Sequence, residues 1–478
     1  MLLPATNVDD AFKSCNPVES LAADDSRYVD FSAARGDEGM AASLCRRRIE
    51  RSDVPLVQLL AGHRGCGKST ELRQLKQALI NSGFVVALVD AETDIDIEDT
   101  EPVDVLLSFI RGLEDSLREQ KIKLDQKSLE SLHKWFAETI VEKTDRTSFE
   151  LEVKSEAKLK GGIPIFASLM TKLTGMIKRG TESKTTIRQK LEPRLSQLLD
   201  RGALLFQKAR DEVRKRGKRD LVLIVDGLDR ISLKKDKPNG LTSHEWLFIE
   251  RGELFKGFGC HTVLTVPISL MFSARSANLS AVFPDRQVLP MIKINQRNGA
   301  RYEEGRTLLE TALSKRVDLK QVFEQGVTEL LIESSGGHPR QLMMLVRYAI
   351  DFVDANPVTM KAAKQAVRKL MLDYDRSVPR DHWPLLAEVA STKTVQNDEH
   401  HQLMLYNLSV LEYQNDARWC DVNPSVRDLP QFIKAASPQT KKVAEPKKVT
   451  RPKKKKAARR KKAAKPTKKA TDKKARGK

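Results

Sequence analysis

The residues best suited to chemistry form one short run of glycines, polar residues and a lysine: Gly62, His63, Arg64, Gly65, Cys66, Gly67, Lys68, Ser69 and Thr70. The first eight match the pattern GxxxxGK[ST], in which glycines let backbone N–H groups turn inward around phosphate oxygens. In this pattern the Lys68 ammonium reaches the β- and γ-phosphates, and the Ser69 hydroxyl binds Mg²⁺. A helix beginning near Ser69 would add its positive dipole end. The run therefore predicts a site for a nucleoside triphosphate with Mg²⁺.

A second candidate is Asp226, which ends the apolar run 221–225. A carboxylate at the end of a buried strand, paired with a phosphate loop, is typical of one that accepts Mg²⁺-bound waters. The alternative is that Asp226 caps the next helix. An apolar stretch over 84–90 lies between the two motifs, which favours the P-loop class with an inserted strand. No NKxD guanine motif follows, so ATP is favoured over GTP.

Near-continuous apolar runs predict the buried parallel strands that would position these residues, over 56–61, 84–90, 221–226, 262–266 and 288–294. A helix is expected over 69–80, so strand, turn, helix and strand follow one another as in an α/β fold. The fold class is therefore an α/β P-loop NTPase core with a parallel sheet. Two short apolar runs around the polar turn 414–416 predict a β-hairpin after helices, which fits a winged helix.

The predicted divisions of the chain are a flexible N-terminal segment (1–26), the core (27–294) with a mainly helical insertion (about 102–215), a helical lid (295–376), a winged-helix-like domain (377–436) and a disordered Lys/Ala/Pro-rich tail (437–478).

The net charge of +20 is concentrated in the last 38 residues. Residues 441–478 hold 20 Lys/Arg and two acids, whereas the rest of the chain is nearly neutral. A segment so charged and so poor in apolar residues is expected to be disordered. Its chemistry predicts sequence-independent binding to nucleic acid through phosphates, without stacking because aromatic residues are missing. The alternatives are a solubility tail, association with RNA or ribosomes, or an acidic membrane surface.

Cysteine and hydropathy patterns exclude several classes of protein. The five cysteines form no CxxC pair, which disfavours a disulfide scaffold or a cysteine-based zinc module and indicates a reducing compartment. No apolar run approaches the roughly 20 residues of a membrane span. The other histidines show no ligand spacing, so no metal beyond nucleotide-bound Mg²⁺ is indicated. We expect a cytoplasmic protein, with nucleoid association (nuclear in a eukaryote) as an option.

Three further stretches give the chain a resemblance to the STAND and AAA+ ATPases, including origin-recognition-like proteins: Leu223-Ile224-Val225-Asp226-Gly227-Leu228-Asp229-Arg230, Gly336-Gly337-His338-Pro339-Arg340, and Tyr28-Val29-Asp30 with Ala34-Arg35-Gly36-Asp37-Glu38. The last pair resembles the segment that packs over adenine in those families. The resemblance covers roughly residues 27–430 and implies an ATP-operated switch in which ATP lies between core and lid. It also implies that an unknown protein partner, or a second copy of the chain, receives the signal.

The resemblance assigns roles to single residues. Lys68 and Ser69 match the Walker A positions, Asp226 matches Walker B, and His338 and Pro339 match a lid motif that touches nucleotide. The less specific matches are Arg340 as a second sensor, Thr265 as a first sensor, and Arg275 or Arg286 as an arginine finger inserted into a neighbour. His338 could instead cap the next helix, the finger candidates could be ordinary surface arginines, and Cys66 could be a tolerated small residue.

One position departs from the family pattern. Many AAA+ proteins have a glutamate directly after the Walker B aspartate, where this chain has Gly227. The next carboxylate is Asp229, which becomes the candidate for orienting the attacking water. Slow hydrolysis is therefore expected. The rival hypotheses are a replication-initiator-like AAA+ loader that grips DNA and a scaffold that binds ATP without cleaving it.

Overall fold

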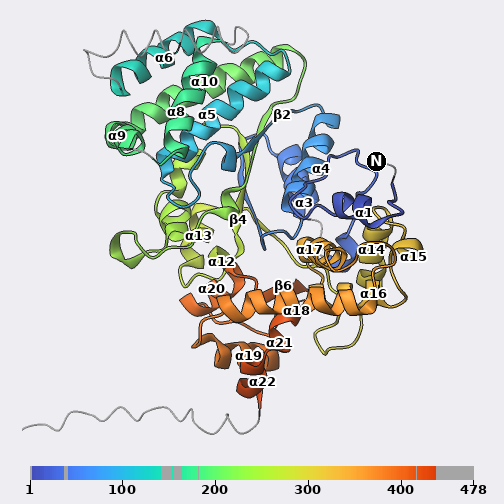
Figure 1. Cartoon of the computed structure of the whole chain (residues 1–478). Coiled ribbons are helices and arrows are strands. Elements are labelled where there is room, and N and C mark those ends of the chain that lie inside the picture. Colours follow the sequence, from blue (N-terminus) through green and yellow to red (C-terminus); the bar gives the residue numbers. More distant parts are fainter. Residues whose placement is uncertain are drawn as a thin grey trace, which may run out of the picture. The chain divides into compact units, whose positions relative to one another are not determined.

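The structure is a computed structural model, and it describes residues 3–36, 41–140, 153, 164–180, 182–415 and 417–437 (Figure 1). Residues Met1–Ala436 form one compact unit. The predicted disordered tail lies outside the described residues, except for residue 437, and so do Asp37 and Glu38 of the adenine-side motif. No helix among the described residues is both long enough and apolar enough to cross a membrane.

A five-stranded parallel sheet with the order β2-β3-β4-β1-β5 forms the centre of the fold. The strands are β1 (Val57–Gly62), β2 (Val85–Asp90), β3 (Leu221–Asp226), β4 (His261–Pro267) and β5 (Arg286–Leu289). β4 lies between β1 and β3, so the strand that ends in the P-loop and the strand that ends in Asp226 are separated by one strand. The predicted α/β core of the inserted-strand class is thus confirmed.

The fifth strand is shorter than the sequence predicts and starts earlier. It ends at Leu289, whereas the apolar run continues to Ile294. After Leu289 the backbone bonds elsewhere, because Met291 N–H donates to Glu412 O at 2.9 Å and Lys293 N–H donates to Ala34 O at 2.9 Å. Residues 290–294 are therefore mostly apolar because they are buried between other segments of the chain, and not because the strand continues in the sheet.

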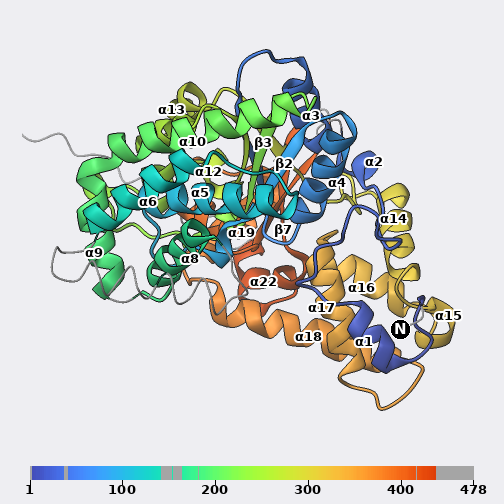
Figure 2. The same cartoon turned by 90° about the horizontal axis from the view of Figure 1, so that it is seen from above.

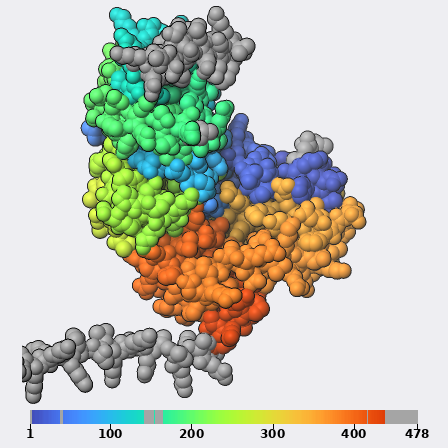
Figure 3. All heavy atoms as spheres, turned by 60° about the vertical axis from the view of Figure 1, so that its left-hand side comes forward, coloured from blue at the N-terminus to red at the C-terminus, as the bar shows by residue number. Residues whose placement is uncertain are grey.

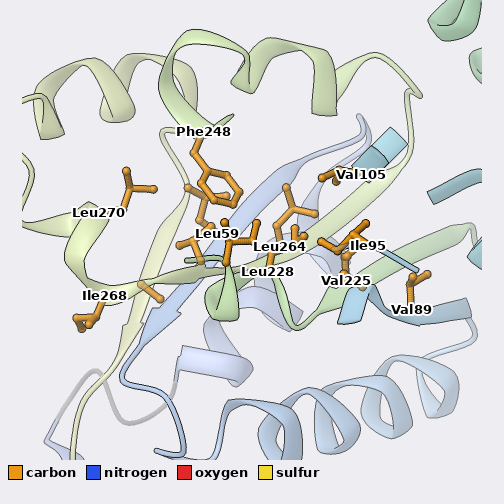
Figure 4. Packing of buried hydrophobic residues seen from close by; sticks show 14 of the residues in the cluster. Leu59, Val89, Ile95, Val105, Val225, Leu228, Phe248, Leu264, Ile268 and Leu270 are labelled. Carbon is orange, nitrogen blue, oxygen red and sulfur yellow. The ribbon is translucent and has the colours of Figure 1, made fainter. Parts of the chain in front are cut away.

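Both faces of the sheet are covered by helices, as Figure 2 shows from above. Side chains alternate between two apolar clusters: Leu59 of β1 faces one and Leu60 faces the other. The smaller cluster packs under α3 (Ala41–Arg51) and α4 (Lys68–Asn81), and the larger one under α5 (Pro102–Glu119) and α10 (Leu195–Lys215). Figure 4 shows part of the larger cluster, in which Leu59, Val225 and Leu264 come from three strands of the sheet. Burial on both faces explains why these strands read as unbroken apolar runs.

The predicted helical insertion consists, in the part that is described, of α5, α6 (Gln126–Ile140), α8 (Ile165–Lys178), α9 (Glu182–Leu191) and α10. It is fixed to the core by ion pairs, such as Lys184 Nζ to Asp96 Oδ2 at 2.8 Å. In Figures 1 and 3 the insertion and the last helices lie at opposite ends of the core.

After β5 the chain forms a run of helices and then one hairpin. The elements are α14 (Glu303–Ser314), α15 (Leu319–Val322), α16 (Val327–Ser335), α17 (Pro339–Ile350), α18 (Met360–Ser377), α19 (His382–Thr392), α20 (Glu399–Tyr406), β6 (Val410–Gln414), β7 (Arg418–Val422), α21 (Pro424–Arg427) and α22 (Pro430–Ala436). β6 and β7 pair antiparallel, as predicted. Helices followed by a hairpin are the order expected of a winged helix, and that assignment stays a prediction.

The N-terminal segment differs from the expected flexible stretch. Residues Val8–Ser14 form α1, which packs on α17, and the Arg347 guanidinium lies 3.8 Å from the centre of the Phe12 ring. Ala5 pairs with Val317 in an isolated parallel bridge. Segment 27–35, with the short α2 (Ser32–Arg35), then crosses to the P-loop. The partners of Ala5 and Phe12, which are Val317 and Arg347, lie more than 300 residues away in the sequence, and no local pattern predicts these contacts.

Candidate functional site

The P-loop lies at the carboxyl ends of the central strands. β1 ends at Gly62 and α4 begins at Lys68, so the loop between them has the predicted strand–turn–helix context. Gly65 and Gly67 have φ angles of 79° and 109°, in the left-handed region that favours glycine. The start of α4 therefore presents backbone N–H groups and the positive end of its dipole at the loop.

Lys68 is buried and makes three polar contacts. Its ammonium donates to the carbonyls of Gly62 at 2.7 Å and His63 at 2.8 Å, and it pairs with Asp229 Oδ2 at 2.9 Å. Burial is the largest single effect and acts to lower the pKa of Lys68, but the neighbouring groups, first among them Asp229, together outweigh it and the net shift is upward. The two residues predicted to bind phosphate and to orient water are thus paired with each other.

Asp226 ends β3 with its carboxylate next to Ser69, and the Ser69 hydroxyl bonds to it. Burial, and then repulsion from Asp229, raises the pKa of Asp226. Asp90 ends the adjacent strand β2 in register with Asp226, and burial raises the pKa of Asp90 as well. Carboxylate and hydroxyl oxygens are the ligands that Mg²⁺ prefers, and crowded acids gain from a cation. The residues present therefore fit a magnesium ion held by Ser69 and Asp226.

The backbone conformation at Gly227 explains why no glutamate directly follows Asp226. Its φ angle is 89°, and a Cβ there would lie 3.1 Å from Asp90 Oδ1 and 3.3 Å from Glu92 N. The turn after β3 thus adopts a backbone that favours glycine and has little room for a side chain.

Replacing Gly227 by glutamate is expected to destabilise the protein by about 1–3 kcal/mol without speeding ATP hydrolysis, because the new carboxylate would be attached to a strained turn. Chemical denaturation and turnover assays measure the two effects. Gly217→Glu is the matched control, since Gly217 has a φ of 74° but no neighbour within 4 Å of a Cβ. A faster Gly227→Glu enzyme of unchanged stability would contradict this account.

A cavity lies beside the P-loop, and several stretches far apart in the sequence line it. The described lining residues include Asn16–Leu21, Arg27–Val29, Phe31 and Arg35, the loop Arg64–Glu71, Asp229 and Arg230, Leu309, Ala312 and Arg316, and Pro339, Arg340 and Met343. Tyr28 and Val29, quoted for the adenine-side motif, are in its wall. Lys68, Ser69 and Asp229 also line it, whereas Asp226, which bonds to Ser69, is not among the described lining residues. The cavity thus combines the polar groups of the P-loop with apolar and aromatic side chains.

The N-terminal segment 16–23 closes one side of this cavity, a role that sequence reasoning missed. Leu21 N–H donates to Thr70 Oγ1 at 3.3 Å, and Gln74 Nε2 donates to Ala23 O at 3.1 Å, which fixes the segment to α4. Arg340 Nε donates to Pro17 O at 3.2 Å, which fixes it to α17. The segment therefore bridges the P-loop helix and the first helix after the lid motif.

His338 caps α17, as one of the two alternatives proposed, and it also contacts the P-loop backbone; it is not among the described lining residues of the cavity, so a contact with nucleotide stays a prediction. Its Nδ1 accepts the N–H of Gln341 at 3.1 Å, and its Nε2–H donates to Arg64 O at 2.8 Å. A Cβ on Gly65 would lie 2.7 Å from Arg340 Cβ and 2.8 Å from His338 Cε1. Gly65 is therefore needed for the close approach of α17, whose first residue Pro339 lines the cavity.

His63 and Arg64 reach toward the C-terminal part of the chain. His63 Nδ1–H donates to Leu405 O at 3.2 Å, and its Nε2 accepts Glu412 N–H at 2.9 Å. The Arg64 guanidinium lies 4.3 Å from the centre of the Tyr406 ring. Arg64 also lines the cavity, whereas His63 is absent from the described lining and points to α20 and β6 instead of the predicted nucleotide. The P-loop is thus bonded directly to the last helices and the hairpin.

Both buried histidines make stability depend on pH. Burial lowers the pKa of His63 and of His338 from 6.5 to about 3. The unfolded chain then binds protons that the folded one excludes, so the free energy of unfolding falls as pH drops below about 6.5, by up to about 1.4 kcal/mol per pH unit for each imidazole. Denaturation between pH 6.5 and 5.5 measures this slope. His63→Gln and His338→Gln should each flatten it. Equal slopes in all proteins would contradict the assignment.

The remaining candidates lie away from the cavity. The Thr265 hydroxyl accepts Leu228 N–H at 3.2 Å, so it supports the turn after β3. Arg275 pairs with Glu250, and Arg286 donates to Ser280. None of the three is among the described lining residues, and a finger role toward a neighbouring molecule stays a prediction.

Arg35 supports the loop from behind, a role its motif did not suggest. It is 2% exposed and donates to Cys66 O at 2.6 Å and to Pro290 O at 2.5 Å. Cys66 itself is buried. A buried arginine on two carbonyls fixes the loop relative to the end of β5.

No family profile and no curated protein matches the sequence. Among solved structures, the fold is similar to that of the Aeropyrum pernix Orc1 protein, solved in complex with DNA (13% identity, TM-score 0.34, covering 83% of this chain and 91% of that one). It is also similar to Cdc6p from Pyrobaculum aerophilum (11%, 0.37, 90% and 99%). The Walker-type ATPase of Pyrococcus abyssi is a third such structure (12%, 0.36, 81% and 93%).

The likeness to these three structures is distant, with TM-scores of 0.34 to 0.37. At 11–13% identity it concerns the fold alone, and the function of the cavity has to follow from its own residues.

Proposed function

We propose that this protein binds ATP with Mg²⁺ in the cavity and hydrolyses it slowly, as a molecular switch. The observation that supports this most strongly is the set of contacts around the P-loop. Lys68 and Asp229 are paired at the cavity, while His63, Arg64 and Gly65 contact α20, β6 and α17. A ligand at this loop therefore acts on groups that also hold the C-terminal helices.

The chain's own residues account for binding. Loop N–H groups and the Lys68 ammonium would donate hydrogen bonds to the phosphate oxygens, so Lys68 must exchange its contact with Asp229 for those oxygens. Ser69 and Asp226 would hold Mg²⁺, which when bound neutralises charge on the phosphates. Tyr28 and Val29 would face the base.

Asp229 is the group positioned to act on water. Once Lys68 turns to phosphate, the Asp229 carboxylate is left at the cavity without its cation. A carboxylate there can accept a proton from water and orient it for attack. Hydrolysis is expected to be slow, because the ion pair between Asp229 and Lys68 must first break and because no glutamate follows Asp226.

Contacts to the P-loop give the switch its physical basis. Phosphate binding would reorient the loop carbonyls, and the Arg64 carbonyl is the acceptor for His338. His63 bonds the same loop to α20 and β6, and Arg64 connects it to α20 by packing on the Tyr406 ring. Occupied and hydrolysed states would therefore favour different positions of the helices after β5.

The deciding experiment compares ATP turnover of the full chain and of residues 1–436, each with and without DNA. We expect slow, magnesium-dependent turnover by both. Bound ATP that stays uncleaved for hours in a single-turnover assay would favour the scaffold hypothesis. An ATP-dependent, sequence-specific footprint made by residues 1–436 would favour the loader.

We further propose that segment 441–478 binds nucleic acid without sequence preference, on the strength of its 20 basic and two acidic residues. Because binding would release counterions from phosphates, affinity is expected to fall steeply with salt. Filter binding to unrelated duplexes at several salt concentrations measures this. Removal of 441–478 should abolish the binding, and undiminished binding after removal would transfer it to the helices and hairpin of 377–436.

A further inference from the structure

Two histidines and an aspartate that are separated in sequence meet where α19 and α20 begin. Asp381 and His382 start α19, and His400 is the second residue of α20. One ligand atom of each lies within 4.8 Å of the others. His382 Nε2 is 3.3 Å from His400 Nδ1, and His400 Nδ1 is 3.6 Å from Asp381 Oδ2.

These separations suit ligands of one tetrahedral metal ion. With Zn–N bonds of about 2.0–2.1 Å, two imidazole nitrogens on the same zinc lie about 3.3 Å apart. The same 3.3 Å contact can hold a hydrogen bond between the rings when no ion is bound. The two rings are almost perpendicular, at 83°, so they do not stack on each other. The spacing therefore suits two ligands of one ion.

The surroundings also suit a cation. His382 is 2% exposed, whereas the side chains of His400 and Asp381 are 53% and 65% exposed. An ion can thus enter from solvent and rest against a fixed inner ligand. Asp398, bonded to His401 at 2.8 Å, adds a second negative charge nearby.

We propose that Asp381, His382 and His400 form a binding site for a divalent transition-metal ion, with Zn²⁺ as the favoured ion. Two imidazoles and one carboxylate are a ligand set that zinc accepts, with water in the fourth position. The ion would join the start of α19 to the start of α20 across the segment 393–398. The far end of α20 carries Leu405 and Tyr406, which hold the P-loop residues His63 and Arg64. The ion would thus stabilise the helix that contacts the P-loop.

The test uses the full chain without nucleotide, stripped with chelator, in buffer with excess Mg²⁺. Titration calorimetry with ZnCl₂ should give one Zn²⁺ per chain and a higher melting temperature. CoCl₂ should produce the visible absorption of tetrahedral Co²⁺. His400→Ala and Asp381→Asn change exposed side chains and should fold; they are expected to weaken Zn²⁺ binding at least about tenfold and to remove the Co²⁺ bands.

Glu399→Gln is the matched control, because Glu399 is 64% exposed at the same helix start but is not a ligand. It should bind Zn²⁺ as the wild type does. If Glu399→Gln and Asp381→Asn weaken Zn²⁺ binding equally, the ion is attracted only by the general negative charge of this region, and the proposed site is wrong. So would a wild type that binds no stoichiometric Zn²⁺, or a His400→Ala variant that binds as tightly as the wild type. These outcomes do not depend on ATP binding.

Discussion

Lys68→Ala is expected to abolish the binding of ATP. The ammonium is a buried cation in the cavity lining, and alanine would remove the amine that this loop pattern places on the β- and γ-phosphates. Equilibrium dialysis or calorimetry with ATP and Mg²⁺ measures the loss. Lys76→Ala, two turns along α4 and outside the described cavity lining, should bind as the wild type does.

A second variant separates the loss of ATP binding from a loss of folding. Lys68→Ala leaves the buried Asp229 carboxylate without its partner, which costs about 3–5 kcal/mol in comparable buried pairs. The double variant Lys68→Ala/Asp229→Asn removes both charges and should recover part of that stability. If either folded variant retains ATP with unchanged affinity, the assignment of the cavity as a nucleotide site is wrong.

Asp229→Asn is expected to slow ATP turnover about 100-fold while leaving ATP bound, because the amide cannot accept a proton from the attacking water. Affinity for ATP should hold or rise, since Lys68 no longer has to leave a carboxylate before it meets phosphate. Phosphate release and nucleotide dissociation are the two readouts.

The matched control is Asp236→Asn, an exposed acid a few residues later. It should change neither quantity. Unchanged turnover in Asp229→Asn would move the role of orienting water to another group, and a large loss of affinity would mean that Asp229 acts in binding.

Local patterns predicted the sheet well. Strands buried on both faces need apolar residues throughout, so β1, β2 and β3 could be placed to within a residue or two from their runs alone. The P-loop was readable because its chemistry fixes both residue type and spacing. The hairpin after α20 was readable for a related reason, since two short apolar runs around a polar turn have few other solutions.

What the sequence hid were contacts between distant segments. Segment 16–23 has no local signal, because its order comes from Thr70, Gln74 and Arg340. Likewise, nothing in the motif shows that His63 bonds to Glu412 of β6 whereas Ser69 lines the cavity. The meeting of His382 with His400 depends on how two helices pack, and a search for regular ligand spacing does not detect it.

The bond from Glu412 to His63 sets an order of events during synthesis. The ribosome makes the phosphate loop early and the hairpin nearly 350 residues later, which at about 5–20 residues per second is a delay of tens of seconds. During that interval the two hydrogen-bond partners of His63, the Leu405 carbonyl of α20 and the Glu412 N–H of β6, have not yet been made. A nascent chain can therefore lay down its sheet early, but it completes the phosphate loop only when its last helices emerge.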